Sequence, residues 1–283
     1  MKFWQAIYES AKKQQKTTMH IWNFMQVIWE PDIMRLIIWR SVLHAGVDGI
    51  ILEFNGEEAL KKEIDKAETA GIPVITIMND APDSKRQSFV GVNDYQMGQA
   101  YGEQVAALMD ENTETALILL DSEKGDFEKS QIYSQISNVV MEQENGENVK
   151  IQAQNLMPEN KFDIEEAIRT IFQSPEGPPQ ILVCMDEVTT ECAYQAMIDF
   201  NMVGEVKIIG YYVSDTIREA VNKGLIPVTC TLDTEKVGKD CIEALWEYKQ
   251  EGRVNSYYNV ELEFVSKNEI PKAIAADTME EQN

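Results

Sequence analysis

The chain has 283 residues, of which 44% are hydrophobic, so it is long enough to build two domains with a core in each. It carries 25 basic and 48 acidic residues, and this formal net charge of −23 argues against nucleic acid as a partner because it repels a phosphate backbone. No apolar run approaches the roughly 20 residues that span a bilayer. The most apolar stretch, 33–43, is interrupted by Arg35 and Arg40.

Hydrophobic periodicity predicts strands that alternate with helices along nearly the whole chain. Strands alternating with helices of this length predict an α/β fold with parallel sheets and right-handed crossovers. In chain order we expect helix 3–16, strand 19–24, helix 32–44, strand 49–54, a helix with Leu60, Ile64 and Ala67 on one face, strand 73–78, strand 89–92, helix 94–110, strand 115–120, helix 127–144, strand 149–154, helix 163–173, strand 181–184, helix 188–200, strand 206–209, helix 215–223, strand 226–232, helix 234–250 and strand 259–265.

The carboxyl ends of these strands are where we expect a ligand. Open parallel sheets bind ligands beyond those ends, because loops converge there and helix N-termini point outward. The predicted strand ends fall at 54–56, 78–82, 121–126, 155–158, 185–187, 211–215 and 232–234. Aromatic, carboxyl and amide side chains at these positions are therefore the candidates for ligand contact.

The residue types that usually carry catalysis or bind metal form no recognisable motif. Four cysteines show no CxxC pair and no metal-like spacing with His20 or His44, so we expect them to be small buried side chains. A bridge between Cys184 and Cys192 stays open as an alternative. The sequence has no GxSxG elbow, Walker loop or HExxH helix, and we expect no catalytic residue, no metal and no cofactor.

Several motifs resemble the sugar-type substrate-binding proteins of ABC transporters, close to the ribose and galactose receptors. They are GVDGIIL from Gly46, AETAGIPVITI from Ala67, SFVGVNDYQMGQAYGE from Ser88, ILVCMDEVTTECAYQAM from Ile181, and VKIIGYYVSDTIREAVNKGLIPVTCTLDTEKVGKDC from Val206. The resemblance implies a type I periplasmic-binding fold, with two Rossmann-like lobes joined by three hinge strands. It divides the chain into an N-terminal lobe, 1–111 plus 233–259, and a C-terminal lobe, 112–232 plus 260–283.

The chain departs from the resembled family at its beginning, because that family has a strand before its first helix. The missing strand is central in the N-lobe sheet, and its loss would leave buried backbone groups unpaired at about 1–3 kcal/mol each. We therefore expect the strand, with an export signal or membrane anchor, to lie upstream of Met1.

The resemblance also assigns candidate ligand contacts. Phe3 and Trp4 match a pair of aromatics that faces the cleft, and Tyr211 and Tyr212 stand where the family has an aromatic followed by Asp. Several hydroxyl-binding groups of the family are absent, with Met78 and Leu232 at two of their places. Either the ligand is more apolar than ribose or galactose, or its polar contacts come from Asn79, Asp80, Asp126, Asp186, Asp233 and backbone groups.

The resulting interpretation is a monomeric, extracytoplasmic binding protein, periplasmic or anchored at the cell surface. It would capture a small carbohydrate or sugar-like ligand in an interlobe cleft for an ABC permease. One alternative is a ligand-sensing domain for a membrane sensor kinase. A second is a LacI-like effector domain, which the acidity and the lack of a DNA-binding headpiece disfavour.

Overall fold

The computed structural model describes residues 2–17, 46–54, 58–121, 130–156 and 161–267. The chain forms two compact units. Unit 1 consists of Met1–Asn93 and Asp233–Glu261, and unit 2 consists of Asp94–Leu232 and Leu262–Asn283. The predicted strand 19–24 and the predicted helix 32–44 lie outside the described residues.

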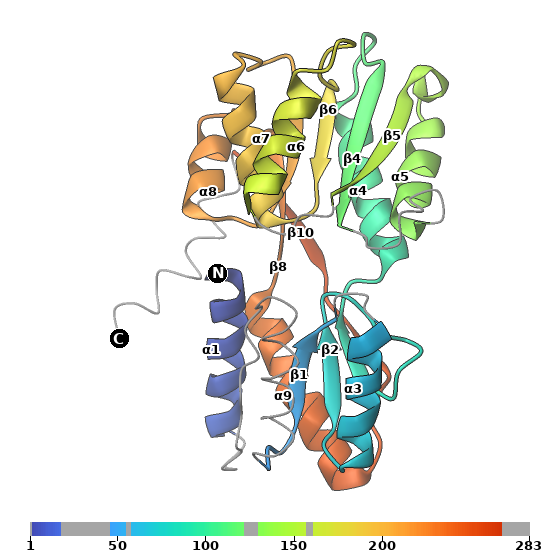
Figure 1. Ribbon diagram of the computed structural model, residues 1–283, viewed down its shortest axis with the longest axis vertical. Helices are drawn as coiled ribbons and strands as arrows, with labels where there is room; N and C mark the ends of the chain where they lie inside the picture. The colour runs from blue at the N-terminus through green and yellow to red at the C-terminus, as the bar shows by residue number, and fades with distance from the viewer. Residues whose placement is uncertain (1, 18–45, 55–57, 122–129, 157–160, 268–283) are drawn as a thin grey trace. The chain divides into compact units, whose positions relative to one another are not determined.

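Unit 1 is built on a four-stranded parallel sheet in the order β1-β2-β3-β9. In Figure 1, α3 lies on one side of this sheet and the packed pair α1 and α9 on the other. Leu60, Ile64 and Ala67 of α3 are buried against the strands, as their helical spacing predicts. The elements of unit 1 are α1 (Lys2–Thr17), β1 (Ile50–Glu53), α3 (Glu58–Thr69), β2 (Val74–Ile77), β3 (Ser88–Gly91), α9 (Thr234–Glu251) and β9 (Tyr257–Asn259).

Unit 2 is built on a six-stranded sheet in the order β10-β8-β7-β6-β4-β5, in which only β10 runs antiparallel to its neighbour. Figure 1 shows α4 and α5 on the opposite side of this sheet from α6 and α7. Its elements are α4 (Asp94–Leu108), β4 (Thr115–Asp121), α5 (Gln131–Met141), η2 (Gly146–Asn148), β5 (Lys150–Leu156), α6 (Lys161–Phe172), β6 (Ile181–Cys184), α7 (Glu187–Asp199), β7 (Lys207–Tyr211), α8 (Asp215–Asn222), β8 (Val228–Leu232) and β10 (Leu262–Ser266).

Central strands of both sheets are covered on both faces, which explains their unbroken apolar sequences. Every residue of β2, β3 and β6 is buried. Full burial of a Leu, Ile or Val side chain contributes about 1.5–3 kcal/mol, so these short strands anchor their units.

Glycines allow two pairs of helices to approach closely. A Cβ at Gly98 of α4 would lie 2.7 Å from the carbonyl oxygen of Ile132 in α5, and a Cβ at Gly102 would lie 2.8 Å from Cβ of Val139. A Cβ at Gly238 of α9 would lie 2.6 Å from a backbone oxygen of α1. The absence of a side chain at these positions sets the distance between the helices.

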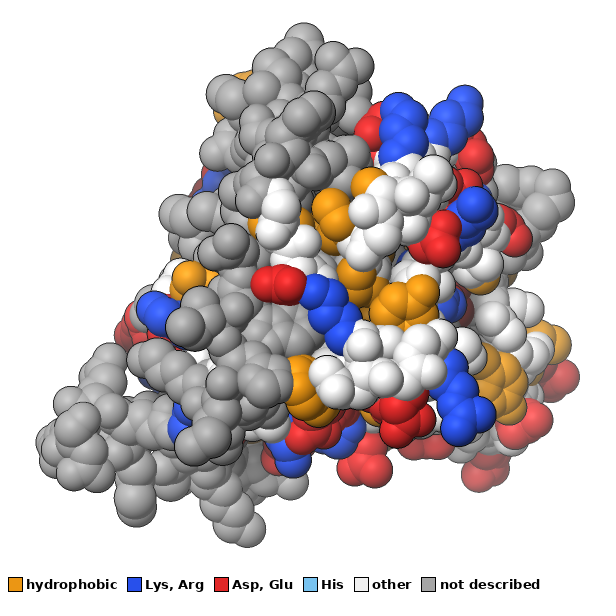
Figure 2. Space-filling model, turned by 90° about the horizontal axis from the view of Figure 1, so that it is seen from below, with side chains coloured by type: hydrophobic (Ala, Val, Ile, Leu, Met, Phe, Trp, Pro, Cys, Tyr) orange, Lys and Arg blue, Asp and Glu red, His pale blue; other side chains and the backbone are white. Residues whose placement is uncertain are grey.

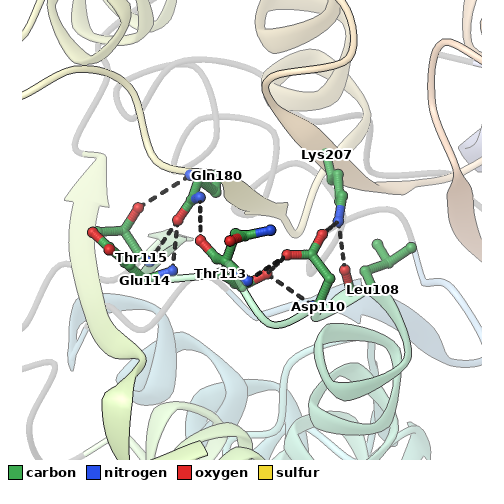
Figure 3. A network of polar contacts seen from close by, with 8 residues as sticks. Leu108, Asp110, Thr113, Glu114, Thr115, Gln180 and Lys207 are labelled. Atoms are coloured by element: carbon green, nitrogen blue, oxygen red, sulfur yellow. Dashed lines mark hydrogen bonds and ion pairs between the residues drawn. The ribbon is translucent and has the colours of Figure 1, made fainter. Parts of the chain in front are cut away.

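Polar side chains tie together the amino ends of β4, β6 and β7 (Figure 3). The Gln180 side-chain oxygen accepts from the backbone N–H groups of Glu114, at 2.6 Å, and Thr115, at 3.1 Å. Lys207 Nζ donates to the last carbonyl of α4 at 2.8 Å and to Asp110 Oδ2 at 2.7 Å. This network fixes the edge of the sheet opposite to the strand ends where a ligand is expected.

The structure differs from the predicted organisation at two places. The predicted strand 259–265 corresponds to β10 over residues 262–265, whereas its first residue, Asn259, ends β9, which pairs with β3 in the other sheet. The first boundary between the units precedes α4, whereas the sequence analysis divided the lobes near residue 111. Helix α4 belongs with unit 2 because it packs on α5 and the residues after it join the network of Figure 3.

Candidate functional site

In unit 1, the candidate edge is formed where the parallel strands end. Met78 follows β2 directly, is half-buried and has a φ of 63°. The next residue, Asn79, is exposed, and its N–H donates to the carbonyl of Ile77 at 2.7 Å. The chain therefore turns sharply at the end of β2 and presents a thioether and a carboxamide there.

Asp80 is engaged by groups of its own unit. Its Oδ1 accepts from Arg86 Nε and from Thr76 Oγ1, the latter at 3.3 Å, and its Oδ2 accepts from Arg86 Nη2 at 2.6 Å. Arg86 Nη1 also donates to the carbonyl of Ser256 at 3.0 Å. Because Thr76 lies within β2, the carboxylate turns back along the strand, and the paired side chains are 29% and 11% exposed for Asp80 and Arg86.

The sequence analysis did not single out Arg86. Arg86 lies six residues after Asp80, just before β3. Its signal in the sequence is weak, because a loop must fold back before the two charges meet.

Asp233 and Lys236 organise the start of α9. The exposed Asp233 is the N-cap, and its Oδ1 accepts from the Lys236 N–H at 2.8 Å. Lys236 Nζ donates to Asp240 Oδ2 at 2.6 Å and to the carbonyl of Asn259 at 3.1 Å, where β9 ends. Lys236, which the sequence analysis did not consider, thus ties the helix start to the end of a strand.

In unit 2, the ends of β6 and β7 are joined by Thr190. Asp186 follows β6 and caps α7, with its Oδ1 accepting from the Thr189 N–H at 2.8 Å. Thr190 Oγ1 donates to the carbonyl of Asp186 at 2.7 Å and accepts from the N–H of Tyr211 at 3.0 Å. One hydroxyl therefore holds two neighbouring strand ends in place, and the sequence analysis missed it because the contact joins residues 21 positions apart.

The two tyrosines at the end of β7 differ in their environment. Tyr211 is buried in unit 2. Tyr212 is half-buried, with a φ of 67°, and its backbone is fixed on both sides. Its N–H donates to the carbonyl of Cys230 at 2.6 Å, and its carbonyl accepts from Thr229 Oγ1 at 2.7 Å. Of the two rings, that of Tyr212 is the more accessible to a ligand.

Met78 and Tyr212 stand out because a left-handed backbone disfavours large side chains. Among the described residues, four residues other than glycine have a positive φ, and the other two are Asn145 and Asn201, a type that tolerates this region well. A bulky side chain there costs on the order of 1–3 kcal/mol, and such strain is often found at functional sites. Each unit therefore has one strained, bulky residue directly after a strand of its candidate edge.

The sequence-predicted candidates fall into three groups. Asp186, Tyr211 and Tyr212 are brought together at the edge of unit 2, whereas Asn79, Asp80 and Asp233 belong to unit 1. Phe3 and Trp4 lie in the first turn of α1, but their side chains are outside the described part of the structure, as is Asp126.

A buried cluster beneath the edge of unit 2 has raised pKa values. Burial, followed by neighbouring Cys230 and Tyr211, raises the pKa of Tyr101 well above its usual value. Its hydroxyl donates to the carbonyl of Gly210 at 3.4 Å. Burial likewise raises the pKa of Cys230 to about 12. These groups stay protonated near neutral pH, as packing groups do.

All four cysteines are buried and free, so the alternative of a Cys184–Cys192 bridge is wrong and the expectation of buried thiols is confirmed. Over the ranges that the structure describes, no group of three or more His, Cys, Asp or Glu residues is placed to hold a metal ion. His20 and His44 lie outside those ranges. In the same part of the chain, no helix has both the length and the apolar composition needed to cross a membrane.

Two hollows in unit 2 are lined by residues of its helices. One, of about 500 Å³, lies between α4 and α5, and the other, of about 240 Å³, lies between α6, α7 and the start of α8. The residues that line these hollows do not include Asp186, Tyr211 or Tyr212. Charges are also mixed on the face of the molecule shown in Figure 2, where acidic and basic side chains alternate over the described residues.

Comparison with known proteins gives a family and a fold. The family described as "Periplasmic binding protein domain" matches residues 3–253. A comparison with curated proteins gave no match. Among solved structures, a glucose-galactose binding protein, GanP, from Geobacillus stearothermophilus is similar, with a TM-score of 0.83, 20% identity, and coverage of 96% of this chain and 95% of that one.

Two further structures share the fold. A carbohydrate transporter solute binding protein from Agrobacterium radiobacter, in complex with D-arabinose, has a TM-score of 0.81 and 18% identity, with coverage of 97% of this chain and 94% of that one. A chain of the XylFII-LytSN complex has a TM-score of 0.76 and 22% identity, with coverage of 94% of both chains. At these identities the likeness establishes the fold alone, which confirms the predicted two-lobed α/β architecture.

Proposed function

This chain belongs to the periplasmic binding protein family, and on that premise we propose that it captures a small carbohydrate or sugar-like solute outside the cytoplasm for an ABC permease. The observation that carries the proposal is the match of this family over residues 3–253. It is supported by the names of similar structures, which describe binding proteins for glucose and galactose and a complex with D-arabinose. The extracytoplasmic location, in the periplasm or at the cell surface, follows from the same premise.

We place ligand contacts at the carboxyl ends of the strands, where the candidate side chains of each unit lie. The exposed carboxamide of Asn79 offers a donor and an acceptor for hydroxyl groups, and the half-buried ring of Tyr212 offers a flat surface for a pyranose. Phe3, Trp4 and Asp126 stay in the proposed set on the strength of the sequence alone. Binding by two lobes that close on one solute is the form of recognition that the resemblance predicts.

A second candidate role is the sensing of the same solute for a membrane partner. The observation in its favour is the structural likeness to a chain of the XylFII-LytSN complex, a binding-protein fold found in an assembly with another protein. This role uses the same ligand site and differs only in which protein receives the closed state.

Thermal denaturation in the presence of sugars tests the proposal. A ligand that binds only the folded state at 100 times its Kd stabilises that state by about 2.7 kcal/mol. At about 2–4 °C for each kcal/mol in a domain of 150–250 residues, a saturable rise in Tm of roughly 5–10 °C is expected. Pentoses, hexoses, 6-deoxyhexoses and disaccharides form the panel, with nucleosides and amino acids as controls. If no sugar raises the Tm and a control compound does, the proposal fails.

A further inference from the structure

The turn after β7 is fixed at both of its ends by one helix of the same unit, α7. Thr190 Oγ1, in the first turn of α7, accepts from the N–H of Tyr211 at 3.0 Å, at the end of β7. The next residue, Glu191, accepts at Oε1 from Ser214 Oγ at 2.7 Å, at the N-cap of α8. Two neighbouring side chains of α7 therefore hold the turn that carries Tyr212.

A third contact with this turn comes from β8. Thr229 Oγ1 donates to the carbonyl of Tyr212 at 2.7 Å. Thr229 and Thr190 are both fully buried, and both reach the end of β7 because Gly210 has no side chain. A Cβ at Gly210 would lie 2.6 Å from Cγ2 of Thr190 and 3.1 Å from Oγ1 of Thr229. The close approach that these contacts require thus depends on the glycine in β7.

These hydrogen bonds keep Tyr212 in a backbone conformation that its residue type disfavours. Its φ is 67°, and a bulky residue keeps such a φ only where the surrounding contacts determine it. The Thr190 hydroxyl also donates to the carbonyl of Asp186 at 2.7 Å. One hydroxyl therefore sets the positions of two candidate ligand contacts of unit 2 relative to each other.

We propose that Thr190 is a positioning residue for ligand binding, whose hydroxyl keeps the turn of Tyr212 in its binding-competent conformation while Glu191 secures the other end. The inference rests on the proposed function and concerns only the ligand contacts of unit 2. When a fraction of the molecules is competent to bind, the apparent Kd rises by the reciprocal of that fraction. A turn that is competent in about one molecule in ten therefore raises the Kd about tenfold.

Titration calorimetry on the whole chain tests the inference. Glucose, galactose and D-arabinose, which appear in the names of two similar structures, are the first probes, and the tightest-binding sugar of the panel is used for the variants. Thr190→Val keeps the shape of the side chain but removes the hydroxyl, and should raise the Kd about tenfold. Thr190→Ser keeps the hydroxyl but loses the methyl group beside Gly210, and should bind within about twofold of the unmodified chain.

Thr189→Val is the matched control. Thr189 is also buried in α7, and its contact with Asp186 is made by the backbone N–H, which valine retains, so the Kd should not change. Glu191→Ala removes the contact at the other end of the turn from a half-buried position, and should raise the Kd about threefold. Urea denaturation of each variant measures its stability separately from its affinity.

The outcomes separate positioning of the ligand contacts from support of the fold. If Thr190→Val is less stable but binds as the control does, the inference is overturned and the proposed function stands. Equal weakening of binding in Thr190→Val and Thr190→Ser also overturns it, because the hydroxyl would then not matter. If Thr190→Val does not fold, an unchanged Kd in Glu191→Ala overturns it instead. Binding of no sugar by the unmodified chain overturns both the inference and the proposed function.

Discussion

Replacement of Asp80 by asparagine should destabilise unit 1 while changing ligand affinity little. The substitution keeps the size of the side chain but removes the charge that faces Arg86, whose side chain is only 11% exposed. It weakens the two contacts with the guanidinium and leaves a largely buried cation without its counter-charge.

The expected loss can be estimated from the contacts. A hydrogen bond to a charged group contributes about 1.5–3 kcal/mol when buried, and two such bonds join this pair. Asp80 is 29% exposed, which lets solvent screen the pair, and asparagine retains one acceptor oxygen. We therefore expect the free energy of unfolding of unit 1 to fall by about 2–3 kcal/mol. In the double variant with Arg86→Met, the two losses should be less than additive by about 1–2 kcal/mol.

Urea denaturation followed by tryptophan fluorescence measures this effect in the right unit, because all five tryptophans fall within the sequence ranges of unit 1. Asp83→Asn in the same loop is the matched control: its side chain is 83% exposed and 3.5 Å from Lys61, so it should cost less than about 0.5 kcal/mol. If Asp80→Asn costs no more than the control but weakens sugar binding tenfold or more, Asp80 is a ligand contact and the reasoning is refuted.

Four further predictions concern other parts of the chain. Gly238→Ala places a methyl group 2.6 Å from the carbonyl oxygen of Ile7 and should lower the free energy of unfolding in urea by about 1–3 kcal/mol. The control Lys239→Ala, at an exposed position of the same helix, should change it little. Equal effects of the two variants would contradict this account of the packing of α1 on α9. The hydrogen bond from Lys207 lowers the pKa of the Asp110 carboxyl, so the ionised carboxylate stabilises unit 2 at neutral pH, and this stabilisation is lost as the pH falls through the lowered pKa. Asp110→Asn should therefore reduce the loss of stability on acidification, measured by circular dichroism. Burial and the neighbouring Glu247 raise the pKa of Tyr258 to about 12, because the folded chain favours the neutral phenol. The resulting stabilisation is complete below pH 10.0 and is lost as the pH rises through about 12. Unfolding of Tyr258→Phe, followed by fluorescence, should not show this loss of stability at alkaline pH. The native chain should not react with a thiol reagent at neutral pH and should expose four thiols on unfolding, and reaction without unfolding would contradict the burial of Cys184, Cys192, Cys230 and Cys241.

Local pattern was enough to predict the elements whose packing follows from their own sequence. Leu60, Ile64 and Ala67 of α3 pack against the apolar strands β1 and β2, and the three elements form a single βαβ unit. Their residues lie close together in the chain, so periodicity carries nearly all the information.

Features that depend on distant segments were not predictable in this way. The roles of Gly98 and Gly102 require α5 to be in place, and the separation of β9 from β10 depends on which sheet each strand joins. Apolar residues continue to alternate between β9 and β10, so the sequence pattern does not show where one strand ends and the next begins. The first unit boundary differed for the same reason, because α4 is assigned by what it packs against.

Part of the candidate site could also be inferred from sequence. Strand ends located Asn79, Asp186 and Tyr212 at the edges of their sheets. The partners Arg86 and Thr190 could not be inferred, since each acts through a loop or helix that must first fold back. The role of every one of these residues in ligand binding stays a prediction.

Titration calorimetry of the unmodified chain with the sugar panel tests the central claim most directly. The account predicts saturable binding of a sugar with one ligand per chain, because the proposed function is the capture of a single solute. Absence of binding by every sugar, or two independent sites per chain, would contradict it.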